Sequence, residues 1–160
     1  MHMRMVRRKQ MSRESRAIEI ELEIINKQFD HDGQVEIVNE SSKAKLYKAA
    51  DGLTVIYDGV DDHGKTVNSS LRINIEKKEI SVRRFGASSL NIEFAENRLY
   101  RTYLTTEYGR LEFVYNTQAI TIPEDILEEI HESEINLKYQ MLFAEQRPIE
   151  NEVLIRFKLQ

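Results

Sequence analysis

Residues 18–24 alternate strictly between apolar and acidic side chains, and this pattern constrains the fold more than any other feature of the chain. The segment reads Ile18, Glu19, Ile20, Glu21, Leu22, Glu23 and Ile24. A repeat of two places the apolar side chains on one face of an extended strand and the carboxylates on the other, whereas a helix would mix them. The segment is therefore predicted to be a β-strand with one buried face.

The same alternation recurs along most of the chain. Turn signals such as Asp32-Gly33 and Asp51-Gly52 separate the alternating segments, and glycine tolerates the positive φ that hairpin turns require. Further strands are expected near 34–49, 53–57, 71–75, 80–82, 90–94, 98–106, 111–117, 135–143 and 153–159. The chain is therefore predicted to be all-β, an antiparallel meander of about 8–10 strands that closes into a barrel or folds into a sandwich.

The charges of the first and last strands favour the barrel. In a closed meander these two strands pair, and the outward Glu19, Glu21 and Glu23 would face the outward Arg156 and Lys158. Opposite charges on directly paired positions stabilise a sheet. We therefore expect residues 18–24 to pair antiparallel with residues 153–159.

One segment departs from the alternation. After Pro123, the apolar residues Ile126, Leu127 and Ile130 have helical spacing, and two acids precede them. Proline and acidic residues are typical of the first turn of a helix. A short helix near 124–131, lying across one mouth of the barrel, is the prediction here.

The N-terminal segment differs from the rest in charge. Residues 1–16 carry six basic groups and one acid, hence +5. Because the whole chain carries −4, residues 17–160 carry −9. We interpret 1–16 as a flexible basic tail, although such a tail can also contact nucleic acid or anionic lipid, and 17–160 as a single barrel domain. The acidic body repels phosphates, so no nucleic-acid partner is expected.

Composition excludes several kinds of site and of segment. The chain has no cysteine, so disulfides and thiolate zinc sites are impossible, and a reducing cytoplasm suits it. The histidines at 2, 31, 63 and 131 lack the spacing of a metal site, and neither a metal nor a cofactor is expected. No apolar run approaches the roughly 20 residues that cross a bilayer. No acid–base or nucleophile set stands out, so we expect no enzyme.

One stretch matches a nucleotide-binding motif by its letters. Residues 59–66 read Gly-Val-Asp-Asp-His-Gly-Lys-Thr, which satisfies the pattern of a phosphate-binding loop. In that loop a helix must follow, so that its N-terminus faces the phosphates. Residues 67–75 alternate as a strand instead, and two aspartates would repel phosphate. The stretch is interpreted as a hairpin loop.

A few polar residues fall on predicted inward faces. Arg84 continues the face of Ile80 and Val82, while Tyr57, Tyr115 and Tyr139 continue other apolar stripes. A buried guanidinium needs hydrogen-bond acceptors, either from the protein or from an anionic ligand. Tyrosines at such positions are core residues or ligand contacts. Both interpretations stay open at this point.

From Tyr57 onward the chain resembles the YwiB-like family of small bacterial proteins of unknown function. The segments that carry the resemblance are Tyr57-Asp58, Gly64-Lys65, Ile80–Gly86, Tyr103–Leu111, Thr117 and Ile135–Met141. The resemblance implies a calycin (lipocalin-like) barrel and cytoplasmic residence, and no activity. The chain departs from the family where Asp58 replaces a usual Glu, and residues 123–132 look particular to this chain. It also has no tryptophan for the G-x-W signature of true lipocalins.

These observations lead to one preferred function and one alternative. The preferred hypothesis is a non-enzymatic barrel that binds a small, partly apolar or anionic ligand in its lumen, with Arg84, Tyr57, Tyr103, Tyr115 and Tyr139 as ligand contacts. The alternative is a protein-interaction module whose lumen is filled by its own side chains. Use of the lumen for ligands is an analogy from the fold.

Overall fold

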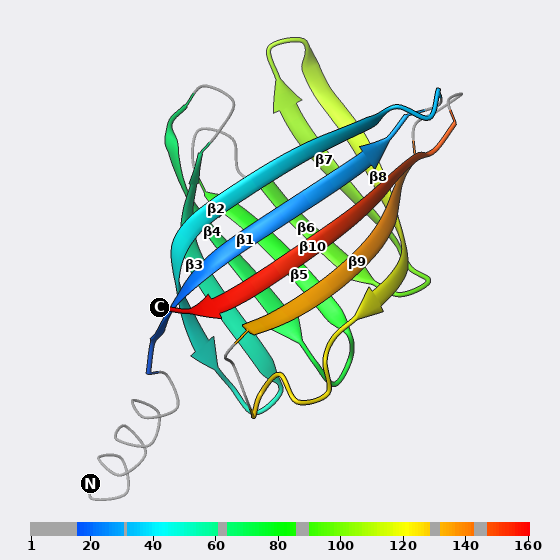
Figure 1. The fold of residues 1–160 in the computed structure, drawn as a ribbon. Coiled ribbons are helices and arrows are strands. Elements are labelled where there is room, and N and C mark those ends of the chain that lie inside the picture. The colour runs from blue at the N-terminus through cyan, green and yellow to red at the C-terminus, as the bar shows by residue number, and fades with distance from the viewer. Residues whose placement is uncertain (1–15, 31, 61–63, 86–89, 129–131, 143–146) are drawn as a thin grey trace, which may run out of the picture.

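The computed structural model describes residues 16–30, 32–60, 64–85, 90–128, 132–142 and 147–160. Ten antiparallel strands account for most of them (Figure 1). They are β1 (Ile18–Phe29), β2 (Val35–Lys48), β3 (Gly52–Val60), β4 (Thr66–Asn74), β5 (Glu79–Phe85), β6 (Leu90–Ala95), β7 (Leu99–Thr106), β8 (Gly109–Thr121), β9 (Glu132–Leu142) and β10 (Ile149–Leu159). The predicted all-β meander is thus confirmed.

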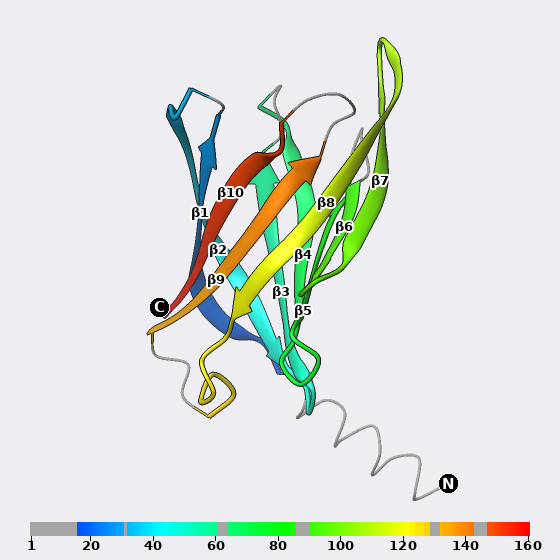
Figure 2. The same cartoon turned by 90° about the vertical axis from the view of Figure 1, so that its right-hand side faces the viewer.

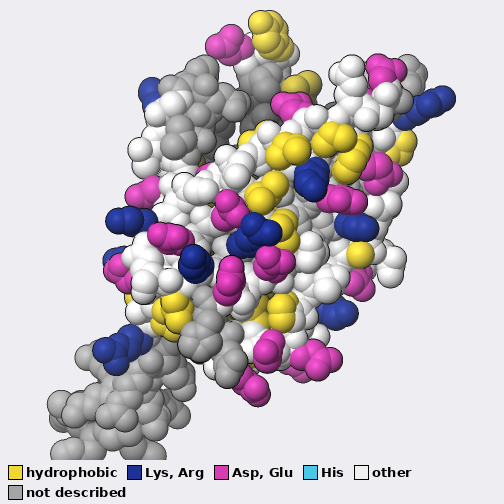
Figure 3. All heavy atoms as spheres, in the orientation of Figure 1, with side chains coloured by type: hydrophobic (Ala, Val, Ile, Leu, Met, Phe, Trp, Pro, Cys, Tyr) yellow, Lys and Arg dark blue, Asp and Glu magenta, His cyan; other side chains and the backbone are white. Residues whose placement is uncertain are grey.

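The first and last strands pair as the charge pattern predicts. β1 runs antiparallel to β10 from Ile20 opposite Leu159 to Phe29 opposite Glu150. On the outer face, the Arg156 Nη1 lies 3.3 Å from Glu23 Oε1, and its Nε donates to Glu134 Oε1 at 2.9 Å. Side chains of both signs lie interspersed on this face (Figure 3). Opposite charges on neighbouring strands therefore accompany the closure.

The barrel is nearly closed, with a seam between β6 and β7. The strand order is β6-β5-β4-β3-β2-β1-β10-β9-β8-β7, so these two strands end the sheet. Across the seam, Thr102 Oγ1 donates to the Asn91 carbonyl at 3.3 Å. The described residues show no backbone ladder there. Figure 2 shows β6 and β7 on the same side of the molecule.

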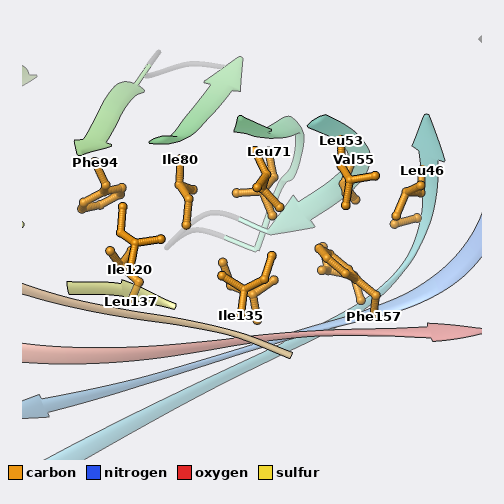
Figure 4. Packing of buried hydrophobic residues seen from close by; sticks show 14 of the residues in the cluster. Leu46, Leu53, Val55, Leu71, Ile80, Phe94, Ile120, Ile135, Leu137 and Phe157 are labelled. Carbon is orange, nitrogen blue, oxygen red and sulfur yellow. The ribbon is translucent and has the colours of Figure 1, made fainter. Parts of the chain in front are cut away.

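Apolar side chains from opposite walls meet inside the barrel. Figure 4 shows one wall contributing residues of β2 to β6 and the other contributing residues of β8 to β10. The labelled members are Leu46, Leu53, Val55, Leu71, Ile80 and Phe94, facing Ile120, Ile135, Leu137 and Phe157. All of these are buried. This part of the lumen is a packed core.

The helix predicted near 124–131 is wrong for the residues that the structure describes. Residues 124–128 form turns, in which Ile126 N donates to the Pro123 carbonyl and Glu128 N to the Asp125 carbonyl. The turns bury Ile126 completely, and Lys48 Nζ donates to the Leu127 carbonyl at 3.0 Å. The segment is therefore held by the packing of Ile126 in the core and by the hydrogen bond from Lys48 of β2, in place of helical hydrogen bonds. Residues 129–131 lie outside the described residues.

Some sequence predictions fall outside the described residues. Residues 1–15 of the predicted tail and the four histidines are among them, so the flexible tail stays a prediction. Within the described part of the chain, none of the structure is a helix long and apolar enough to cross a membrane.

Two phenylalanines permit a matched test of the core. Phe157 is 0% exposed between the walls, whereas Phe85 is 52% exposed. Phe157→Ala should lower the free energy of unfolding by about 3–5 kcal/mol, because it leaves a cavity in a packed lumen. Phe85→Ala should change it by no more than about 0.5 kcal/mol. Urea denaturation followed by circular dichroism measures both, and equal losses would contradict a filled lumen.

Candidate functional site

Seven polar side chains occupy inward-facing positions on six strands, and we call them the polar cluster. Direct pairing places Ser42 opposite the core residue Leu22, and it places Ser69 opposite both Tyr57 and Arg84. Residues directly opposite in an antiparallel pair share a face. The members are Asn26, Glu40, Ser42, Tyr57, Ser69, Arg84 and Tyr139.

An ion pair lies at the centre of the polar cluster. Arg84 Nη2 on β5 lies 3.3 Å from Glu40 Oε2 on β2, and both side chains are about one-third exposed or less, at 34% and 26%. The Arg84 side chain also hydrogen-bonds Tyr57, as does Ser69. Burial raises the pKa of the Tyr57 phenol, and the nearby Glu40 carboxylate raises it further. Arg84 therefore has acceptors within the protein.

Strands β2 and β3 separate at the level of this ion pair. Their ladder ends where Ala44 pairs with Tyr57, while β3 continues beside β4 to Val60. Glu40 lies four residues beyond that end. A Cβ built on Gly59 would come within 2.7 Å of Glu40 Oε1 and 3.4 Å of Ser69 Oγ. The missing side chain at Gly59 is what lets the carboxylate reach across the gap.

Three buried polar atoms in the cluster have no hydrogen-bond partner in the structure as described. They are Asn26 Oδ1, Glu40 Oε1 and Ser42 Oγ. A buried polar group without a partner costs about 1–3 kcal/mol. Such groups are rare, and each one points to a bound water, an ion or a functional role. The cluster therefore has unused hydrogen-bonding capacity.

Tyr139 joins the cluster to a group of aromatic rings. The Asn26 side-chain amide donates to the Tyr139 phenol, and burial raises the pKa of this phenol to about 12. The Tyr139 ring centroid lies 4.9 Å from that of Phe94 and 5.6 Å from that of Tyr115. Tilted and edge contacts at these distances are favourable. The contact between Asn26 and Tyr139 thus links the polar cluster to the aromatic part of the core.

Four of the five tyrosine and arginine candidates form two pairs on inward-facing positions, and the fifth lies apart. Arg84 and Tyr57 are in direct contact, and Tyr139 and Tyr115 share the aromatic group. Tyr103 is 46% exposed and lies under the Arg110 guanidinium, 4.0 Å from its ring centroid. On the same strand, Tyr100 pairs with the buried Tyr115 and therefore faces inward. Tyr103 is three positions further on, and because side chains alternate along a strand, it faces outward.

Sequence reasoning missed Glu40, Asn26, Ser42 and Ser69. Each continues an apolar stripe at a spacing of two, the same signal that singled out Arg84. Asn26 follows Ile24, Ser69 precedes Leu71, and Ser42 and Glu40 extend the stripe of Leu46 and Ala44. A short polar residue on such a stripe also occurs at an open barrel end, so the pattern alone does not identify a cluster.

The stretch with the nucleotide-binding letters continues into a strand. β4 begins at Thr66 and pairs with β3 as far as Gly52 opposite Asn74. Residues 61–63 lie outside the described residues. Because a strand follows Lys65, no helix N-terminus is available to face a phosphate there.

The fold and the cluster define a class: a nearly closed, ten-stranded antiparallel barrel with polar side chains on part of its inner wall. The family described as "Domain of unknown function (DUF1934)" matches residues 22–155, and the chain belongs to it. The predicted YwiB-like membership is confirmed. No match was found among curated proteins.

A solved structure supports the same fold. The ywiB protein of Bacillus subtilis is similar with a TM-score of 0.76 over 94% of this chain and 98% of that chain. The two sequences are 18% identical, so the likeness concerns the fold alone.

A double-mutant cycle tests the contact between Gly59 and Glu40. Gly59→Ala should lower the free energy of unfolding by about 1 kcal/mol more in the wild type than in a Glu40→Ala background, because the new methyl group displaces the carboxylate from Arg84. In a Glu134→Ala background, on the outer wall of β9, the cost should match the wild type within about 0.5 kcal/mol. Urea denaturation of the variants measures these terms. The same cost in all backgrounds would contradict the contact.

The raised pKa of Tyr139 predicts a loss of stability in alkali. The phenol ionises near 10 in the unfolded chain and near 12 in the barrel, so its contribution is complete below pH 10. That contribution declines between pH 10 and 12 by roughly 2–3 kcal/mol, because only the unfolded state releases the proton there. Tyr139→Phe should flatten this decline, measured by denaturation at several pH values. Tyr108→Phe, on an exposed turn, is the control and should leave the decline unchanged.

Proposed function

We propose that this protein is a non-enzymatic barrel that binds a small, partly apolar ligand at the polar cluster. The single observation that carries the proposal is the set of three buried polar atoms without partners, Asn26 Oδ1, Glu40 Oε1 and Ser42 Oγ. A ligand that hydrogen-bonds to them removes the free-energy cost of leaving them unpaired. Ligand sites combine a few such polar groups with apolar walls.

The surroundings of the cluster support the apolar part of the proposal. The rings of Phe94, Tyr115 and Tyr139 pack together beside Asn26. Arg84, Tyr57, Tyr115 and Tyr139 are the proposed ligand contacts that we retain, together with Asn26, Glu40 and Ser42. The outward position of Tyr103 removes the geometric support for its role as a contact.

A second candidate function rests on a different observation. The apolar core fills the lumen between the walls, while Val35, Ile37 and Val38 of β2 are about half exposed or more. Residues 35–43 pair with β1 on one side and extend beyond the ladder with β3 on the other. An exposed strand edge of this kind suits a protein-interaction module.

Cytoplasmic residence is also part of the proposal. A chain without cysteine needs no oxidising compartment for its fold, and the proposal agrees with the resemblance to small bacterial proteins. Detection of the chromosomally tagged protein in the cytosolic fraction of its cell would support this; recovery outside the cell would contradict it.

Native mass spectrometry of freshly purified protein tests the ligand proposal. We expect the wild type to carry a small-molecule adduct, and Asn26→Leu to carry less of it, because leucine keeps the volume but removes the amide. Asn136→Leu places the same change on the exposed outer face of β9 and should retain the adduct. Circular dichroism confirms that each variant is folded. Equal occupancy in both variants, or no adduct in the wild type, would contradict a ligand at the cluster and favour the interaction module.

A further inference from the structure

We infer that the polar cluster selects a small organic cation of the ammonium type, which donates hydrogen bonds, over an anion. This inference rests on the proposed function and names the class of its ligand. It reverses the expectation that an inward arginine attracts an anion, since the structure gives Arg84 its own carboxylate.

The positive charge of Arg84 is already balanced. Its Nη2 lies 3.3 Å from Glu40 Oε2, and its side chain also hydrogen-bonds Tyr57. The cluster contains one cation and one anion, so its formal charge is zero. An incoming anion would have to separate this pair or approach the Glu40 carboxylate without a compensating charge. Both arrangements are unfavourable in a partly desolvated site.

The unused capacity lies on acceptor atoms. A carboxylate oxygen and an amide oxygen accept hydrogen bonds and cannot donate them, and a serine hydroxyl can do either. Glu40 and Ser42 are two positions apart on β2 and therefore share a face. Asn26 lies on the neighbouring strand β1, two positions from Ile24, which pairs directly with Glu40. An ammonium group has three donors and no acceptor. Its donors match all three atoms, whereas a carboxylate could accept a hydrogen bond only from the Ser42 hydroxyl.

The neighbouring rings suit the same class of ligand. Asn26 donates to Tyr139, whose ring contacts Phe94 and Tyr115. The face of an aromatic ring carries partial negative charge and attracts organic cations. The hydrocarbon part of an amine can therefore lie against the rings while its nitrogen bonds to the acceptors.

The separation of β2 from β3 supplies the approach. The ladder ends at Ala44 and Tyr57, and the Glu40 and Arg84 side chains beyond it remain 26% and 34% exposed. Glu40 Oε1 itself is buried beside Gly59. A donor that approaches from solvent therefore meets the partly exposed Glu40 carboxylate.

Three probes with one carbon skeleton test the inference: benzylamine, benzoate and benzyl alcohol. Each is titrated into the full chain while its amide resonances are followed by two-dimensional NMR. We expect benzylamine to shift the Asn26 side-chain amide and the backbone amides of residues 40–42 saturably, with benzoate causing no such shifts. Glu40→Gln should weaken benzylamine binding at least tenfold, since it removes the negative charge. Glu112→Gln removes a carboxylate from an exposed ion pair with Arg101 and should leave binding unchanged.

Ser42→Ala provides a second variant should Glu40→Gln fail to fold, and we expect it to weaken benzylamine binding severalfold. Saturable binding of benzoate at the cluster would overturn the inference while leaving the proposed ligand site in place. Equal affinity of benzylamine for the wild type and Glu40→Gln would also overturn it, as would the absence of cluster shifts with all three probes. The native mass spectrum decides the proposed function independently of these outcomes.

Discussion

The pairing of β1 with β10 is the interaction on which the barrel depends. The sheet ends at β6 and β7, which the described residues do not join by a ladder. Without the β1–β10 ladder, the sheet would divide into two meanders, β1 to β6 and β7 to β10. This ladder spans ten residue pairs and joins the two ends of the chain, so it closes the longest loop in the molecule. Pairs of such large sequence separation carry a high entropic cost of loop closure. Burial of four apolar side chains on the inner faces of β1 and β10 offsets this entropic cost. They are Ile20, Leu22, Ile155 and Phe157.

The sequence contained most of the information for this fold because one face of nearly every strand is buried. Alternation located the strands, and Glu23 opposite Arg156 confirmed the predicted closure. The prediction of a helix near 124–131 was wrong for a local reason. The spacing of its apolar residues indicates which side chains point inward, and consecutive turns over 124–128 are compatible with the same spacing. The position of the open seam between β6 and β7 could not be predicted from the sequence, because edge strands and central strands show the same alternation of apolar and polar residues. Register is set by which face is buried, but closure is set by the whole assembly.

The candidate site shows a different limit of sequence reasoning. Arg84 attracted notice because a long cation on an apolar stripe is conspicuous, but its role depended on Glu40, 44 positions away. Nothing in the sequence states that these residues meet across the gap between β2 and β3. The sequence also does not indicate why position 59 is a glycine. The structure shows the reason, because a Cβ at this position would come within 2.7 Å of the Glu40 carboxylate. Pairwise chemistry between distant strands is visible only in three dimensions, and it changed the inferred ligand from anion to cation.

The division between packed core and polar cluster separates stability from recognition. Aliphatic core residues such as Leu46, Ile80 and Ile135 are 0% exposed, and removing one of them leaves a cavity whose cost a ligand elsewhere cannot recover. The cluster instead contains buried polar atoms without hydrogen-bond partners in the structure as described, and such atoms lower the stability of a folded protein. A ligand offsets the free-energy cost of these unpaired atoms only if it places hydrogen-bond donors against them. The same atoms would therefore also discriminate between ligands. The proposed ligand would meet a cluster in which the charges of Arg84 and Glu40 already balance each other. The proposed charge selection therefore depends on the same ion pair that keeps Arg84 supplied with an acceptor.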